Sequence, residues 1–309
     1  MNARAARWLR VLVPVLATSA LALGTVGADA APGRAPAAHT ARVTSAPSCN
    51  PHASSLRPSG PPQVTPGSFM AKIRARGYLI AGVDQSTYHF GFLNPLNGQI
   101  EGFDIDMIRA VAQAIFGNPN KVQFKAITDA QRIPDVLSGA VDIVAHTMTI
   151  TCARLQQVDF SSVYFDAAQR VLVLKSSPAK SLADLKGQKG CATTGSDSLS
   201  VIAKAGAVPV AVPYWTDCLV LLQQGDVAAI STDDSILDGL AAQDPSTMLV
   251  GPRLTDEPYG LAISKQHPEF VRFVNGVLQQ LRTNGQWAAS YAHWVGPSVP
   301  APPAAQYGG

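Results

Sequence analysis

The sequence lacks the motifs of several functional classes. It has four cysteines, but no Cys-x-x-Cys pair and no Cys/His spacing typical of a zinc site. It also has no G-x-S-x-G nucleophile motif and no glycine-rich phosphate-binding loop. Its 24 Lys and Arg residues nearly balance its 21 Asp and Glu residues, and no basic stripe suited to nucleic acid or anionic lipid is present. We therefore expect no metal, no cofactor, no catalytic residue and no nucleic-acid partner.

The N-terminus has the features of an export signal. Arg4, Arg7 and Arg10 precede an apolar run from Val11 to Leu23, and Ala28-Asp29-Ala30 has the small-x-small pattern of a cleavage site. A membrane anchor is the alternative, but it would need about twenty apolar residues. We predict a signal peptide over residues 1–30 and an extracytoplasmic mature protein. Cleavage removes three arginines and one aspartate, which leaves the mature chain nearly neutral.

Two segments contain too few large apolar residues to form a packed core. Residues 31–67 are rich in Pro, Ala and Ser and contain no Phe, Tyr or Trp, which predicts a linker, ordered only if Cys49 is bridged. Residues 296–309 resemble them, and we predict a disordered tail. Between these segments, apolar strands alternate with amphipathic helices, a pattern that predicts an α/β fold with a mostly parallel sheet.

A polar cluster follows one apolar strand, Val141–Ala145. Arg154 comes soon after it, and three threonines lie between: Thr147, Thr149 and Thr151. Ligands of parallel sheets bind at the carboxyl ends of the strands, so Arg154 is placed to hold a carboxylate through two hydrogen bonds. Arg132, in the preceding helical segment, could hold a second carboxylate. The alternative is that Arg154 is a solvated turn residue and the threonines only favour the strand.

Seven segments of the chain together resemble a known family. They are RGYLIAGVDQSTYHFGF, IEGFDIDMIRAVAQAIFG, RIPDVLSGAVDIV, TMTITCARLQQVDFSSVYF, TGSDSLSVI, GDVAAISTDD and EPYGLAISK, in that order between Arg76 and Val295. The chain resembles the family 3 extracellular solute-binding proteins of polar amino-acid ABC transporters, and its glutamate-binding members most. The resemblance implies a two-lobe type II periplasmic-binding-protein fold with two crossover strands.

The resemblance also implies where the lobes and the disulfides lie. The chain would cross between lobes near Gln169-Arg170 and near Asp256-Glu257, so that residues 68–168 and 258–295 form lobe 1 and residues 169–257 form lobe 2. An oxidising compartment allows the four cysteines to pair. Cys191 and Cys218 both fall in lobe 2, which favours the pairs Cys191–Cys218 and Cys49–Cys152. Four free buried thiols are the alternative.

Several residues match ligand-binding positions of the family. Arg154 and Thr149 would bind the α-carboxylate of an amino acid, and Thr147 and Asp233 would accept from its ammonium group. Ser196 lies in a turn that contacts ligand in the family, although the acidic Asp197 beside it departs from the family pattern. A helix N-cap is the alternative role for Asp233, unless Asp234 caps instead.

Selection of the ligand side chain falls to lobe 1 in this family. Acidic amino-acid binders carry an arginine before Ile-Pro, which is Arg132 here; a surface arginine is the alternative. His146 is a second polar candidate, although a structural histidine is as frequent at a strand end. Tyr88 or Phe90 would pack on the methylene groups of the ligand.

The resemblance implies a function in amino-acid import. The expected protein is a monomer that closes on L-glutamate, or on aspartate or glutamine, and delivers it to an ABC permease. No cysteine directly follows the apolar run, so lipid anchoring is not expected. One alternative is an amino-acid sensor for a membrane signalling partner. The other is an enzyme resembling the cyclohexadienyl dehydratases, which would need an acid or base in the cleft.

Overall fold

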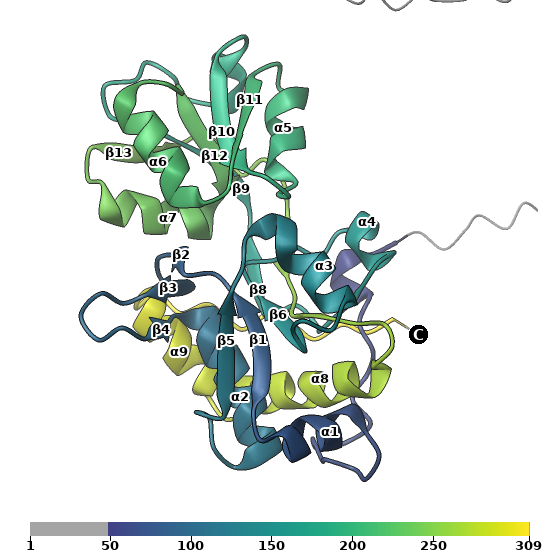
Figure 1. The fold of residues 1–309 in the computed structure, drawn as a ribbon. Coiled ribbons are helices and arrows are strands. Elements are labelled where there is room, and N and C mark those ends of the chain that lie inside the picture. The colour runs from purple at the N-terminus through teal and green to yellow at the C-terminus, as the bar shows by residue number, and fades with distance from the viewer. Residues whose placement is uncertain (1–48, 309) are drawn as a thin grey trace, which may run out of the picture. The chain divides into compact units, whose positions relative to one another are not determined.

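The computed structural model describes residues 49–308 (Figure 1). The predicted signal peptide and residues 31–48 of the predicted linker lie outside the described residues. Among residues 49–308, no helix is both long enough and apolar enough to cross a membrane. This part of the chain contains two five-stranded sheets, each with its own hydrophobic core.

The first sheet has the strand order β5-β1-β6-β15-β7. The strands are β1 (Leu79–Val83), β5 (Val122–Ala126), β6 (Ile143–Ala145), β7 (Asp159–Phe160) and β15 (Ala262–Ile263). β1 is parallel to β5 and β6, whereas β15 is antiparallel to β6 and β7. Because both faces of this sheet are covered, its central strands are apolar at nearly every position. The sheet is thus mostly parallel, as the alternation of strands and helices predicts.

Helices α1 (Phe69–Arg76), α2 (Phe103–Phe116), α8 (Pro268–Thr283) and α9 (Gln286–Trp294) complete this core. One face of α2 is apolar and fully buried: Ile105, Ile108, Val111, Ala112 and Ile115. Burying one such large aliphatic side chain contributes roughly 1.5–3 kcal/mol. Gly117 ends the helix at φ +70°, a left-handed conformation that costs glycine little. A small sheet of β2 (Ser86–Thr87), β3 (Gly91–Leu93) and β4 (Ile100–Glu101) lies before α2 in the chain.

The second sheet has the strand order β11-β10-β12-β9-β13. Its strands are β9 (Gln169–Leu174), β10 (Lys189–Thr193), β11 (Val208–Val212), β12 (Ala229–Asp233) and β13 (Thr247–Val250). The helices α5 (Ser198–Lys204), α6 (Trp215–Gln224) and α7 (Asp234–Gln243) pack with it, and a 3-10 turn spans Leu182–Leu185. Asp233 is the last residue of β12.

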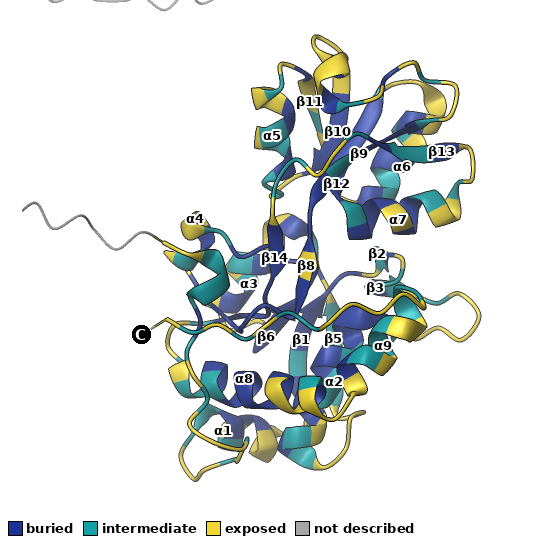
Figure 2. Ribbon diagram, turned by 180° about the vertical axis from the view of Figure 1, so that it is seen from behind, coloured by how far each residue is buried: buried dark blue, intermediate teal, exposed yellow. Residues whose placement is uncertain are grey.

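Two short strands join the sheets. β8 (Phe165–Ala167) pairs antiparallel with β14 (Glu257–Tyr259), and Figure 2 shows them side by side. β8 continues directly into β9 of the second sheet, and β14 leads back to β15 of the first. We therefore propose that residues 68–168 and 258–295 form lobe 1 and residues 169–257 form lobe 2, with β8 and β14 as the crossover strands.

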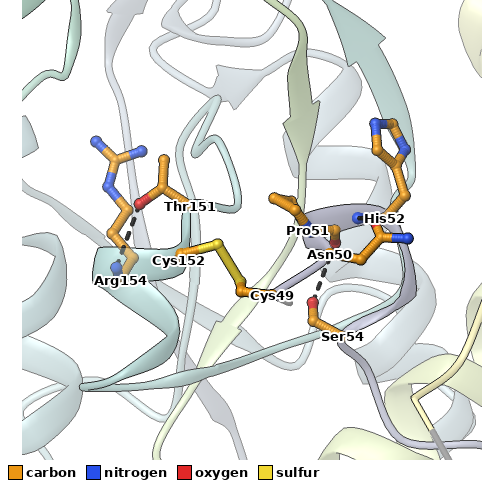
Figure 3. The surroundings of a disulfide bond; sticks show 8 residues. All are labelled: Cys49, Asn50, Pro51, His52, Ser54, Thr151, Cys152 and Arg154. Carbon is orange, nitrogen blue, oxygen red and sulfur yellow. Dashed lines mark hydrogen bonds between the residues drawn. A yellow bond between two sulfur atoms is a disulfide. The ribbon is translucent and has the colours of Figure 1, made fainter. Parts of the chain in front are cut away.

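The structure gives both disulfide pairs favoured above, Cys49–Cys152 (Figure 3) and Cys191–Cys218. Cys49 begins a segment that continues through a 3-10 turn, Pro51–Ala53, and then packs on lobe 1. Its Ser55 pairs with Tyr307 of the C-terminal segment. The buried Asn275 side chain donates to Ser55 Oγ and to Leu56 O, and it accepts from the Ser162 N–H.

These contacts contradict the predicted disorder of residues 296–308. The Gly308 N–H donates to Ser55 O, and the Arg57 guanidinium lies 5.1 Å from the ring of Tyr307. Composition indicated that the tail could not form a core of its own. It does not need one, because the two terminal segments hydrogen-bond to each other and to a surface that lobe 1 already provides.

Candidate functional site

Thr147 lies at the carboxyl end of β6 in a strained backbone conformation. Its φ is +41°, which is rare for a β-branched residue and typical of functional sites. The Thr147 N–H donates to Asp104 Oδ2 at 2.7 Å, and the Tyr164 hydroxyl donates to Asp104 Oδ1 at 2.6 Å. Burial raises the pKa of Asp104 to about 6. Asp104 thus holds the Thr147 backbone in place.

Arg154 lies in a short helix, α4 (Cys152–Leu155), which Thr151 caps (Figure 3). The Cys49–Cys152 disulfide fixes the first residue of this helix. The guanidinium is buried: Nη1 donates to Thr149 O at 2.7 Å, and Nη2 lies 3.3 Å from Asp197 Oδ1. Arg154 is therefore not a solvated turn residue.

Arg132 begins α3 (Arg132–Leu137), which follows the 3-10 turn Asp129–Gln131, and its side chain is buried. Its Nη1 lies 2.8 Å from Asp129 Oδ1 and donates to His146 O at 3.2 Å. Burial alone would raise the pKa of Asp129, but the Arg132 and His146 side chains bring it below its ordinary value. Arg132 thus has an ionised partner within lobe 1, and sequence reasoning missed Asp129.

Asp233 is buried at the end of β12, and its carboxylate accepts from the Tyr259 hydroxyl at 2.6 Å. Although Asp233 occupies the N-cap position of α7, its side chain makes no capping hydrogen bond. Asp234 instead accepts from the Ser235 N–H. Burial and then the nearby Glu257 carboxylate raise the pKa of Asp233 well above its ordinary value, while burial and Asp197 raise the pKa of Glu257 to about 7.

A turn of lobe 2, Gly195–Ser198, contacts both arginines of lobe 1. Gly195 O accepts from Arg132 Nη2 at 3.3 Å and from Arg154 Nη2 at 3.4 Å. Gly195 has φ +91°, and a Cβ there would come within 2.7 Å of Ala130 Cα. The Ser196 hydroxyl donates to Thr193 O, and the Thr193 hydroxyl donates to Asp129 across the lobes. Glycine at position 195 therefore allows the lobes to meet here.

A cavity lies where these groups converge. It is lined by Asp129, Arg132, Thr147, Thr149, Arg154, Ser196, Asp197, Ser198, Trp215, Thr232, Asp233 and Ile236. Its volume is about 10 Å³ for the centres of water-sized spheres, roughly one water molecule. An amino acid therefore requires the lobes or the facing side chains to move apart. Among residues 49–308, no three His, Cys, Asp or Glu side chains are grouped to hold a metal ion.

Six of the predicted ligand-binding residues line this cavity: Arg132, Thr147, Thr149, Arg154, Ser196 and Asp233. The cavity-lining set does not include three others. Tyr88 is exposed beside Phe92, Phe90 packs against Phe165 and Tyr259, and His146 Nε2 lies 3.0 Å from Ile127 O. The ring that lines the cavity belongs to Trp215 instead. The sequence could have indicated Trp215, because it is the first residue of a helix that follows a strand.

Comparison with known proteins identifies the family. The family model of the bacterial extracellular solute-binding proteins, family 3, matches residues 79–297. The chain belongs to this family. It is 37% identical to the ABC transporter glutamine-binding protein GlnH of Bacillus subtilis, over 73% of the chain and 84% of the relative. It is 27% identical to the glutamate/aspartate import solute-binding protein of Salmonella typhimurium, over 76% of the chain and 82% of the relative.

A solved structure agrees with this assignment. An ancestral arginine-binding protein bound to glutamine has a TM-score of 0.67 and 35% identity, over 72% of this chain and 99% of that one. The predicted two-lobe periplasmic-binding fold is therefore confirmed. The family 3 protein described here is an amino-acid-binding component of an ABC transporter, and its relatives are solute-binding proteins rather than enzymes.

Proposed function

We propose that this exported family 3 protein binds an amino acid with an uncharged polar side chain, L-glutamine foremost, and delivers it as a monomer to an ABC permease. Arg154 of lobe 1, with Thr149, holds the α-carboxylate. Asp233 of lobe 2, with Thr147, holds the ammonium group. Because each lobe supplies only part of the ligand's partners, the closed state gains them together and closure accompanies binding.

The preference for glutamine over glutamate rests on the ion pair between Arg132 and Asp129. Arg132 Nη1 and Asp129 Oδ1 lie 2.8 Å apart, and both side chains are almost fully buried. A distal carboxylate placed against Arg132 would also lie near the Asp129 carboxylate, and like charges placed together cost several kcal/mol. An uncharged amide can donate and accept hydrogen bonds beside such a pair without that cost. The 37% identity to a glutamine-binding relative supports the same ranking.

Calorimetric titration of Arg154→Ala tests the carboxylate anchor. Removing one partner of a buried charge pair costs roughly 2–5 kcal/mol, or roughly 30-fold to several thousandfold in affinity. Arg253, which is exposed near the crossover strands, provides the matched control in Arg253→Ala. Binding of glutamine by Arg154→Ala within about threefold of the wild-type protein would overturn the assignment.

A double-mutant cycle tests the role of Arg132. If Arg132 neutralises Asp129, Arg132→Met leaves a buried carboxylate unpaired, destabilises the fold by roughly 3–5 kcal/mol and weakens the binding of both glutamine and glutamate. Adding Asp129→Asn should then restore most of the stability. If Arg132 instead reads a distal carboxylate, Arg132→Met should weaken glutamate far more than glutamine, and Asp129→Asn should not compensate.

A further inference from the structure

Asp197 has an unusual role for a residue at a helix start. It occupies the N-cap position of α5, where aspartate usually accepts from the backbone, yet its side chain makes no capping hydrogen bond. Its Oδ1 atom instead lies 3.3 Å from Arg154 Nη2, across the boundary between the proposed lobes. The Asp197 carboxylate of lobe 2 thus contacts Arg154 in the cleft and does not cap its own helix.

This contact places Asp197 in competition with the ligand. Arg154 Nη1 already donates to Thr149 O, so a two-bond grip on a ligand carboxylate draws on Nη2, which Asp197 contacts. A bound α-carboxylate and Asp197 must therefore share one guanidinium or separate. The Asp197 side chain is 35% exposed, compared with 10% for that of Arg154, so Asp197 can turn toward solvent while Arg154 stays in place.

The other charges around the cavity also disfavour an additional carboxylate. Three carboxylates line it, Asp129, Asp197 and Asp233, against the two guanidinium groups of Arg132 and Arg154. A zwitterion such as glutamine adds no net charge to this set, because its ammonium pairs with Asp233 and its carboxylate with Arg154. Once the ammonium group has ionised Asp233, the three carboxylates exceed the two guanidinium groups by one negative charge, and a glutamate ligand adds another.

We propose that Asp197 is a specificity-determining residue that discriminates against amino acids carrying a second carboxylate. This inference rests on the proposed function, since it takes Arg154 as the anchor of the α-carboxylate. Asp197 acts through repulsion: it weakens the binding of glutamate and aspartate more than that of glutamine, which carries only the α-carboxylate. Discrimination of this kind selects a ligand by disfavouring its close competitor.

The test is a titration of Asp197→Asn with glutamine and with glutamate. The substitution preserves the size of the side chain, and the missing capping bond indicates that α5 does not depend on the carboxylate. Both ligands should bind more tightly than to the wild-type protein, because their α-carboxylate no longer competes with Asp197 for Arg154. The ratio of the affinity for glutamate to that for glutamine should rise at least about tenfold, because only glutamate carries a second carboxylate. Asp197→Glu, which keeps the charge, should retain the wild-type preference.

Asp226→Asn is the control, because Asp226 is exposed in the loop after α6 and its replacement removes the same charge from lobe 2. It should leave the ratio of the two affinities unchanged. An unchanged ratio in Asp197→Asn, with glutamine still bound by the wild-type protein, would overturn the role of Asp197 alone. A wild-type protein that binds neither ligand would overturn the proposed function instead.

Discussion

The affinity for glutamine should rise with pH, because the ammonium group of the ligand displaces a proton from the cleft. Burial and Glu257 raise the pKa of Asp233 well above its ordinary value, so Asp233 in the ligand-free protein keeps its proton to a higher pH than an exposed aspartate does. An ammonium group beside Asp233 favours the ionised carboxylate. Glutamine itself remains a zwitterion across this range, so the pH dependence belongs to the protein.

The expected magnitude follows from linkage. Release of one proton on binding changes the affinity tenfold per pH unit, which corresponds to 1.36 kcal/mol per unit. The affinity should therefore increase by up to about 100-fold between pH 5.5 and 7.5, and by less where release is partial. Glu257 has a raised pKa of about 7, so it acquires its charge within this window and keeps Asp233 protonated at higher pH.

Calorimetry in two buffers of different ionisation enthalpy measures the released protons directly. In Glu257→Gln, the loss of a neighbouring carboxylate should lower the pKa of Asp233 and reduce both the proton release and the slope of affinity against pH. Glu269→Gln, at the half-buried start of α8, is the matched control. An affinity that does not change between pH 5.5 and 7.5, with equal heats in both buffers, would refute the pairing of the ammonium with Asp233.

Three substitutions probe closure and the terminal segments. Gly239→Ala should weaken glutamine binding by roughly 5-fold to 150-fold in calorimetry, since its Cβ would lie 2.6 Å from Tyr88 O; an unchanged affinity would mean that this contact is absent in the bound state. Asn275→Ala should lower the free energy of unfolding by about 3 kcal/mol, because it leaves buried polar groups unpaired, and a loss below about 1 kcal/mol in urea titration would contradict that. Joint replacement of Cys49 and Cys152 by serine should cost about 2–4 kcal/mol in the same assay, whereas unchanged stability would show that this disulfide is dispensable.

The sequence predicted the parts of the fold that depend on local pattern. The apolar run of β1 and the amphipathic face of α2 specify their own elements, because each pattern lies in neighbouring residues of the sequence. The turn after β6 was also predictable, because Thr147, Thr149 and Arg154 follow a buried strand at the end where ligands gather.

Pairings between distant residues could not be predicted in this way. No local pattern shows that Asp129 neutralises Arg132 or that Asp104 accepts a hydrogen bond from Thr147. Nor does one show that the Asp197 side chain contacts Arg154 instead of capping its helix. The order of residues 296–308 has the same origin, since Tyr307 is held by Ser55, far away in the sequence. Each of these contacts joins segments that only the folded chain brings together.

The most direct test of the account is a calorimetric titration of the mature protein with the twenty amino acids at pH 7.5. The account predicts that glutamine binds most tightly, and that glutamate and aspartate bind at least about tenfold more weakly. Preferential binding of glutamate or aspartate would contradict the proposed selection by the Arg132–Asp129 pair. Failure of every amino acid to bind would contradict the assignment of the cleft itself.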